Sequence, residues 1–244
     1  MKIVLKITFK YVRFLFVLLA FACSHGHASL TSELRFQRLT SLGADQLSTL
    51  SLIQDRQGFI WIGTNNGGLY RYNGYQTEKY QHIPTNEQSL PHDRVAALFE
   101  DKEGHIWVGT QNGLARFNIE RGDFTRFAPK ASTSGQRIIK EIISDGASGL
   151  WLATWGGLQH FDPASGRFTL YAHDQAAPAS LATNDLNAIT LDVQGGVWAG
   201  TWPAGIDYLA PGASEFRHYR VDTDQAPDPK LNIVRSLHMD AQHT

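Results

Sequence analysis

The stretch DRQGFIWIGTNNGGLYRY, from Asp55 to Tyr72, decides the fold because three further versions of it follow along the chain. They read DKEGHIWVGTQNGLARF from Asp101, DGASGLWLATWGGLQHF from Asp145 and DVQGGVWAGTWPAGIDYL from Asp192. The four tryptophans are Trp61, Trp107, Trp151 and Trp198, at spacings of 46, 44 and 47 residues. Such a period indicates a repeat architecture, in which each unit buries its apolar faces against its neighbours.

Each repeat divides into four short segments with the composition of β-strands. The Asp-x-x-Gly sequence, or a variant with the glycine one place later, predicts a hairpin turn before the tryptophan strand. The first strands are expected at Leu50–Gln54, Val95–Glu100, Ile139–Ser144 and Asn187–Leu191. Four strands in about 45 residues is the size of a propeller blade. We therefore predict an all-β β-propeller, with four-stranded blades at about 48–90, 91–133, 134–183 and 184–229.

Two further segments belong to a blade that the sequence does not complete. Residues 34–40 resemble the fourth strand of a repeat, and residues 231–244 contain a fifth aspartate, Asp240, preceded by a first strand at Asn232–Met239. The expectation is an incomplete ring of four whole blades plus two strands of another. Unpaired strand edges invite association, so we expect self-association or support from downstream receptor domains.

The N-terminal 28 residues have the order of a secretory signal peptide. Four basic residues precede an apolar run at Phe14–Cys23, and Gly26-His27-Ala28 supplies small residues for cleavage after Ala28. An uncleaved anchor and a lipoprotein modified at Cys23 are the alternatives. The run is shorter than the roughly 20 residues that a membrane span needs.

Composition narrows the class of protein. Lys and Arg number 22 against 23 Asp and Glu, and loss of the four basic residues in 1–28 leaves 18 − 23 = −5. This balance disfavours nucleic acid as a partner, because phosphate binding needs clustered Lys and Arg. The mature chain also lacks cysteine, which suits an oxidising compartment. We expect a periplasmic location.

The residues shared by all repeats are interpreted as structural. Asp55, Asp101, Asp145 and Asp192 precede a turn in every copy, which favours a turn role over catalysis or calcium binding. The four repeated tryptophans are expected in the cores between blades. The sequence contains no nucleophile elbow, phosphate loop or dinucleotide fingerprint. We therefore expect no catalytic residue, metal site or cofactor in this chain.

Positions that differ between repeats carry the candidate binding site. Directly after the tryptophan-strand threonine stand Asn65, Gln111, Trp155 and Trp202. Equivalent loops lie at one end of a propeller, so Trp155 and Trp202 are expected to offer a stacking surface for an oligosaccharide or a peptide. Packing between blades is the alternative role. A second variable set, on the third strand, is expected to line the axis or face solvent: Arg71, Arg116, His160 and Tyr208.

The full repeat motif resembles the two-component regulator propeller family. Its run of Asp-x-x-Gly-x-(Ile/Leu)-Trp-(apolar)-Gly-Thr-x-x-Gly-Leu-x-Arg-(Tyr/Phe) is matched almost throughout from Asp55 and from Asp101. The third copy departs at Ala153 and His160. The fourth departs at Pro203, Asp207 and Tyr208. The resemblance covers about residues 34–244.

The resemblance implies a periplasmic sensor region of a receptor in the inner membrane, with a histidine kinase or a GGDEF-type diguanylate cyclase as output. The kinase and cyclase motifs do not occur in this sequence, so the chain is interpreted as an N-terminal portion of such a receptor or as a truncated relative. A protein-interaction platform is one alternative. A periplasmic propeller lyase or hydrolase is another, and it would need an acid/base pair near the axis.

Overall fold

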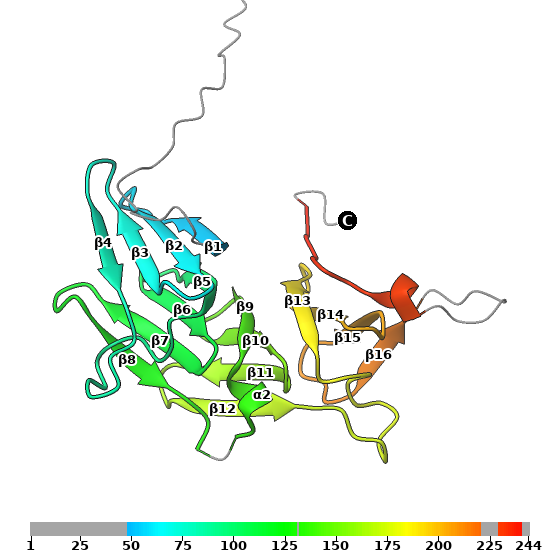
Figure 1. Ribbon diagram of the computed structural model, residues 1–244. Helices are drawn as coiled ribbons and strands as arrows, with labels where there is room; N and C mark the ends of the chain where they lie inside the picture. Colours follow the sequence, from blue (N-terminus) through cyan, green and yellow to red (C-terminus); the bar gives the residue numbers. More distant parts are fainter. Residues whose placement is uncertain (1–47, 131, 221–228, 241–244) are drawn as a thin grey trace, which may run out of the picture. The chain divides into compact units, whose positions relative to one another are not determined.

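The computed structural model describes residues 48–130, 132–220 and 229–240. The expected signal peptide at 1–28 and the expected strand at 34–40 lie outside these residues. The described chain forms sixteen strands, one α-helix of four residues and one short 3₁₀-helix (Figure 1). No helix among these residues is long and apolar enough to cross a membrane.

The sixteen strands form four antiparallel sheets of four strands each, paired in chain order. Blade 1 contains β1 (Thr49–Gln54), β2 (Ile60–Thr64), β3 (Leu69–Tyr72) and β4 (Thr77–Tyr80). Blade 2 contains β5 (Val95–Glu100), β6 (Ile106–Thr110), β7 (Gly113–Asn118) and β8 (Asp123–Phe127). Blade 3 contains β9 (Ile139–Ser144), β10 (Leu150–Thr154), β11 (Gly157–Asp162) and β12 (Arg167–Tyr171). Blade 4 contains β13 (Leu186–Leu191), β14 (Val197–Thr201), β15 (Ile206–Leu209) and β16 (Phe216–Tyr219). The predicted fold is confirmed, and the first strand of each of these four blades agrees with its expected range to within one residue.

The repeated tryptophans of blades 1 and 2 fill the space between one blade and the next. Trp61 and Trp107 each expose only 1% of their surface. The ring of Trp61 lies 4.9 Å from that of Phe117 on β7, and the ring of Trp107 lies 5.7 Å from that of Phe161 on β11. Each indole thus contacts the third strand of the following blade. The apolar core is accordingly divided into clusters at the blade interfaces.

Glycine in the tryptophan strand allows the first strand of the next blade to approach closely. A Cβ atom on Gly109 would lie 2.6 Å from Cγ2 of Ile139, the first residue of β9. A Cβ atom on Gly63 would lie 2.7 Å from Cγ1 of Val95, which opens β5. Real Cβ atoms do not come this close, so the Trp-x-Gly-Thr sequence fixes the spacing of the blades as well as their strands.

The first strands of the four blades contact one another in series, β1 to β5, β5 to β9 and β9 to β13. All four contribute to one axial pocket, whose lining includes residues 50–52, 96–98, 140–142 and 187–188. The residues of these strands that face this pocket therefore define the inside of the propeller.

The segment Asn232–Met239 departs from the expected strand. The structure shows the 3₁₀-helix η2 (Pro229–Asn232) followed by extended chain without strand pairing. The backbone N–H of Val234 donates to Thr201 O (3.2 Å), and Gly205 N donates to Asn232 O (2.8 Å). The segment therefore lies where a fifth first strand would lie. Its residues have no strand ladder in the part of the chain that the structure describes.

The connections between blades come in two kinds, which the repeat motif did not predict. In the links from blade 1 to 2 and from blade 3 to 4, His82 Nδ1 contacts Leu90 O and His173 Nδ1 contacts Leu181 O, each at 2.7 Å. The link from blade 2 to 3 instead contains α2 (Ser134–Arg137), capped by Thr133. Helix α2 lies beside the turn that carries Trp155, because Gln159 Nε2 donates to Gln136 O at 2.7 Å.

Candidate functional site

The four variable turn positions occupy equivalent places at one end of the blades. In each, the backbone N–H donates to the carbonyl of the residue that precedes the blade's first strand. The partners are Ser48 for Asn65 (2.9 Å), Arg94 for Gln111 (3.1 Å), Ile138 for Trp155 (3.3 Å) and Asp185 for Trp202 (2.9 Å). These bonds hold the first residue of each turn in the same place, so the side chains at this position distinguish one blade from another.

Two of these four residues meet at one pocket. Trp155 is 43% exposed and Trp202 is 39% exposed. Both line a pocket of about 360 Å³ together with Lys140, Asp185, Asn187 and Arg235. Asn65 and Gln111 do not line this pocket. The structure therefore brings together the two aromatic members of the predicted binding set and leaves out the two amides.

Each pocket tryptophan is paired with a cation. Lys140 Nζ lies 5.2 Å from the ring centre of Trp155, and Arg235 Cζ lies 5.7 Å from that of Trp202. These distances are within the range of cation–π attraction. Burial lowers the pKa of Lys140, although Asp185 opposes this effect. Lys140 extends from β9, whereas Arg235 comes from the segment after η2, so the pocket draws on parts of the chain far apart in sequence.

Asp185 provides a carboxylate at the same place. Its Oδ1 atom is buried and has no hydrogen-bond partner among the described residues. Burial raises the pKa of Asp185, and the charge of Lys140 counteracts part of that rise. Asn187 donates from Nδ2 to Val234 O at 3.0 Å, which ties β13 to the segment carrying Arg235. An acceptor without a donor is costly when buried, and Asp185 lines the pocket, so its carboxylate is suited to a hydroxyl or N–H group of a ligand.

The axial pocket adjoins this site. It has a volume of about 310 Å³ and shares Lys140, Asn187 and Arg235 with the first pocket. Glu141 also lines it and accepts from Ile189 N at 2.7 Å. Burial raises the pKa of Glu141 while that hydrogen bond lowers it. Glu141 thus joins β9 to β13 in the lining of the axial pocket.

The repeated aspartates cap their own turns. Asp55 Oδ1 accepts from Gln57 N (3.0 Å) and Phe59 N (2.9 Å), and its Oδ2 accepts from Trp61 Nε1 (2.8 Å). Asp192 makes the same set of bonds, with Trp198 Nε1 at 3.3 Å. The carboxylate therefore joins the turn to the indole of the next strand, which explains why Asp and Trp recur at a fixed separation.

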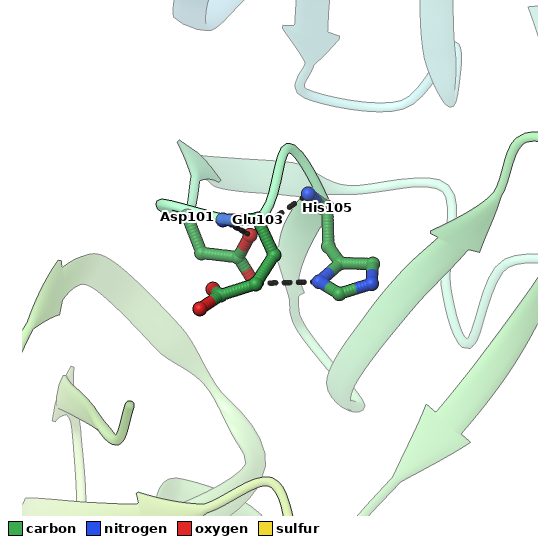
Figure 2. Close-up of side chains that lie close together, drawn as sticks. All are labelled: Asp101, Glu103 and His105. Atoms are coloured by element: carbon green, nitrogen blue, oxygen red, sulfur yellow. Dashed lines mark hydrogen bonds and ion pairs between the residues drawn. The ribbon is translucent and has the colours of Figure 1, made fainter. Parts of the chain in front are cut away.

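Asp101 has the same role within a group of side chains whose arrangement resembles a metal site. Ligand atoms of Asp101, Glu103 and His105 lie within 4.8 Å of one another. Figure 2 shows the three side chains together at the turn between β5 and β6. Yet Asp101 Oδ1 accepts from Glu103 N and His105 N, and its Oδ2 accepts from Trp107 Nε1 at 2.7 Å. Nδ1 of His105 lies 2.9 Å from that same Oδ2. Both carboxylate oxygens are engaged by the turn, so the cluster is accounted for by the fold.

The side chains of the second variable set pack against the repeated tryptophans. They do not line the pockets at the axis, and they do not simply face solvent. Arg116 Cζ is 5.7 Å from the ring of Trp107, and the rings of His160 and Tyr208 lie 4.7 and 4.5 Å from those of Trp151 and Trp198. Arg71 packs 3.6 Å above Phe59 and 5.3 Å from Trp61. In blade 3, His160 Nε2 lies 2.9 Å from Asp145 Oδ2. The prediction that these side chains line the axis or face solvent was wrong. Each of these residues is the direct ladder partner of the repeated tryptophan, so the two side chains lie on the same face of the blade.

Sequence reasoning missed the polar half of the pocket, although a signal for it exists. The second residue of each first strand lines the axis, and these positions hold Leu50, Ala96, Lys140 and Asn187; Arg235 lines the same pocket from the extended segment after η2. The axial residue is apolar in blades 1 and 2 and polar from blade 3 onward. The turn residue changes at the same point of the chain, from Asn65 and Gln111 to Trp155 and Trp202. Two variable positions that change together would have indicated one site.

Sequence comparison relates the repeats to a known family. Residues 43–66 and 89–112 match the two-component regulator propeller family. This match confirms the resemblance drawn from the repeat motif. No curated protein matches the chain in sequence.

Solved structures with a similar fold belong to proteins of several different functions. The extracellular domain assigned to a hybrid two component system of B. thetaiotaomicron has a TM-score of 0.66 at 24% identity, over 80% of this chain and 26% of that one. A second such domain from the same organism has a TM-score of 0.54 at 18% identity, over 82% and 36% of the two chains. Virginiamycin B lyase from Staphylococcus aureus has a TM-score of 0.54 at 14% identity, over 73% and 57%. At these identities the likeness establishes the fold, and this chain spans about a quarter of the first domain's length.

Proposed function

We propose that this chain, whose repeats match the two-component regulator propeller family, is the extracytoplasmic ligand-sensing module of a signalling receptor. The observation that carries the proposal is the pocket between Trp155 and Trp202. Small-ligand sites are concave and combine aromatic side chains with a few polar groups. The pocket has this composition, and the equivalent turns of blades 1 and 2 contribute nothing to it.

The proposal places the chain in a larger protein. In it, these blades form the N-terminal part of a sensor region in the periplasm, exported by the signal peptide at 1–28. The receptor is anchored in the inner membrane and carries a histidine kinase or a diguanylate cyclase as output. The two B. thetaiotaomicron domains of similar fold, both described as extracellular domains of two component systems, support this placement.

Two other functions are alternatives to ligand sensing. A protein-interaction platform would use an extended surface, whereas the two half-exposed tryptophans line a concave pocket. A periplasmic lyase or hydrolase is compatible with the fold, because the S. aureus lyase shares it, but fold alone does not specify function. An enzyme would consume its ligand with time. A sensor would return it unchanged.

The test is a binding screen on the mature chain with matched variants. Defined oligosaccharides and short peptides are titrated while tryptophan fluorescence is recorded, and each bound compound is recovered and analysed by mass spectrometry. We expect a compound that binds wild type, is recovered intact, and loses at least about tenfold in affinity in Trp155→Ala/Trp202→Ala. The control is Asn65→Ala/Gln111→Ala, which alters the same turn positions outside the pocket. Equal loss in both double variants, or none in the tryptophan pair, would refute the proposed site.

A further inference from the structure

We propose that the ligand of the Trp155/Trp202 pocket is an acidic saccharide, whose carboxylate binds Lys140 and Arg235 while its sugar rings pack on the two indoles. This inference rests on the proposed function, because it specifies the ligand of the same pocket. It follows from the charges, the unpaired acceptor and the aromatic faces that line the pocket.

The charge of the pocket is opposite in sign to that of the chain. Two cations and one carboxylate line it, so its formal charge is +1, in a chain whose net charge is −1. Neither Lys140 nor Arg235 forms an ion pair with any described carboxylate. Burial depresses the pKa of Lys140, Asp185 opposes this effect, and Arg94 adds to it. Because the pocket holds one more cation than carboxylates, an anionic group is the ligand chemistry that its charge favours.

The remaining polar group favours hydroxyls in the same ligand. Asp185 Oδ1 is buried without a donor in the described residues, while the backbone oxygen of Asp185 already accepts from Trp202. A simple anion would be repelled by this carboxylate and would leave it unpaired. A sugar hydroxyl placed beside the ligand's own carboxylate would donate to the carboxylate of Asp185, so one uronate residue satisfies both the cations and the acid that line the pocket.

The aromatic groups favour a saccharide over an acidic peptide. Trp155 and Trp202 keep about two fifths of their surface exposed, even though each is paired with a cation. Flat indole faces accept the C–H faces of pyranose rings, and a pocket of about 360 Å³ is within the range of small-ligand sites. Acidic side chains of a peptide offer carboxylates but no such rigid apolar face.

The experiment compares three probes by isothermal titration of the mature chain. They are a galacturonate disaccharide, the neutral galactose disaccharide of the same linkage, and the dipeptide Glu-Glu. We expect the acidic disaccharide to bind at least about tenfold more tightly than the other two, and its affinity to fall as salt is raised. Lys140→Met and Arg235→Gln should each weaken the acidic disaccharide about tenfold, leaving any binding of the neutral one unchanged.

Two further variants separate a charge effect from damage to the fold. Lys79→Met is the matched control, because Lys79 Nζ also lies over an aromatic ring, 5.7 Å from that of Tyr70, but on β4 outside the pocket. It should leave binding unchanged. Asp185→Asn keeps an acceptor oxygen and removes a negative charge, so it should tighten the acidic disaccharide relative to the neutral one. Simple structural damage would weaken both.

Each other outcome overturns the inference in a recognisable way. Equal binding of the two disaccharides, sensitive to Trp155→Ala but not to Lys140→Met, would refute the acidic ligand and leave the sensing site intact. Tighter binding of Glu-Glu would make the ligand a peptide. Binding of none of the three by folded wild type would refute the inference, while the broader compound screen would still decide the proposed function.

Discussion

Replacing Asp55 by alanine tests whether the repeated aspartate holds the turn and the indole together. The carboxylate accepts three hydrogen bonds, from two backbone N–H groups of the turn and from Trp61 Nε1. The indole is 1% exposed, and an unsatisfied buried donor costs about 1–3 kcal/mol. The two turn bonds add roughly 1 kcal/mol each. Asp55→Ala should therefore lower the free energy of unfolding by about 3–5 kcal/mol.

Asp145 offers an internal comparison for that figure. Its carboxylate accepts from Ala147 N and Gly149 N, but its other oxygen contacts His160, a partly exposed ring. Water can solvate that ring when the carboxylate is removed, so Asp145→Ala should cost less than Asp55→Ala. The difference between the two variants measures the contribution of the buried indole.

The assay is urea unfolding followed by circular dichroism and tryptophan fluorescence, with Asp162→Ala as the control. Asp162 ends β11, and its carboxylate accepts from Ala164 N and Ser165 Oγ in an exposed turn where water can replace both donors, so its loss should change the midpoint little. An Asp55→Ala midpoint that matches the Asp162→Ala midpoint would refute the structural role assigned to the repeat. A loss in Asp145→Ala as large as in Asp55→Ala would refute the role of the indole.

Three other predictions follow from the same contacts. Burial alone would raise the pKa of the turn carboxylates Asp101, Asp145 and Asp192, but their hydrogen bonds outweigh it and hold each pKa below its usual value. Their stabilisation is therefore complete above about pH 4 and is lost as the pH falls through the lowered values, which urea midpoints between pH 6 and 2.5 will check. Gly109→Ala should destabilise the fold by roughly 1–3 kcal/mol because its Cβ would overlap Ile139, and thermal unfolding measures this loss. Leu52, 62% exposed on β1, should promote self-association, so Leu52→Glu should shift the chain toward monomer in light scattering.

The fold was predictable because each repeat contains residues that mark its turn, its interface and its contact with the next blade. Asp55 marks the turn, Trp61 marks the interface, and Gly63 marks the close approach of the next blade. The first two recur in register in all four copies, and the glycine recurs in three, with Ala153 in its place in the third. A single copy would have left a short apolar run without a defined partner. Four copies removed that ambiguity, because the spacing of the tryptophans set the strand count for each unit.

Only part of the candidate site could be predicted in this way. Trp155 and Trp202 stood out because they differ from their counterparts in the other blades. Lys140 was hidden, because a lysine in a strand ordinarily faces solvent and its inward direction depends on the blade geometry. Arg235 was harder still, because its segment was expected to be a strand and instead lies along blade 4 without ladder partners. The pocket is thus a product of how the blades are arranged, which no single repeat encodes.

The most direct test of the central claim is ¹⁹F NMR of the mature chain labelled with 5-fluorotryptophan. The sequence contains six tryptophans, four in the repeat positions and two at the pocket, so each resonance can be assigned by substitution. On titration with a saccharide that binds the chain, the resonances of Trp155 and Trp202 should shift together, while those of Trp61, Trp107, Trp151 and Trp198 stay in place. Saturating binding that leaves the Trp155 and Trp202 resonances unmoved would show that the ligand is held elsewhere.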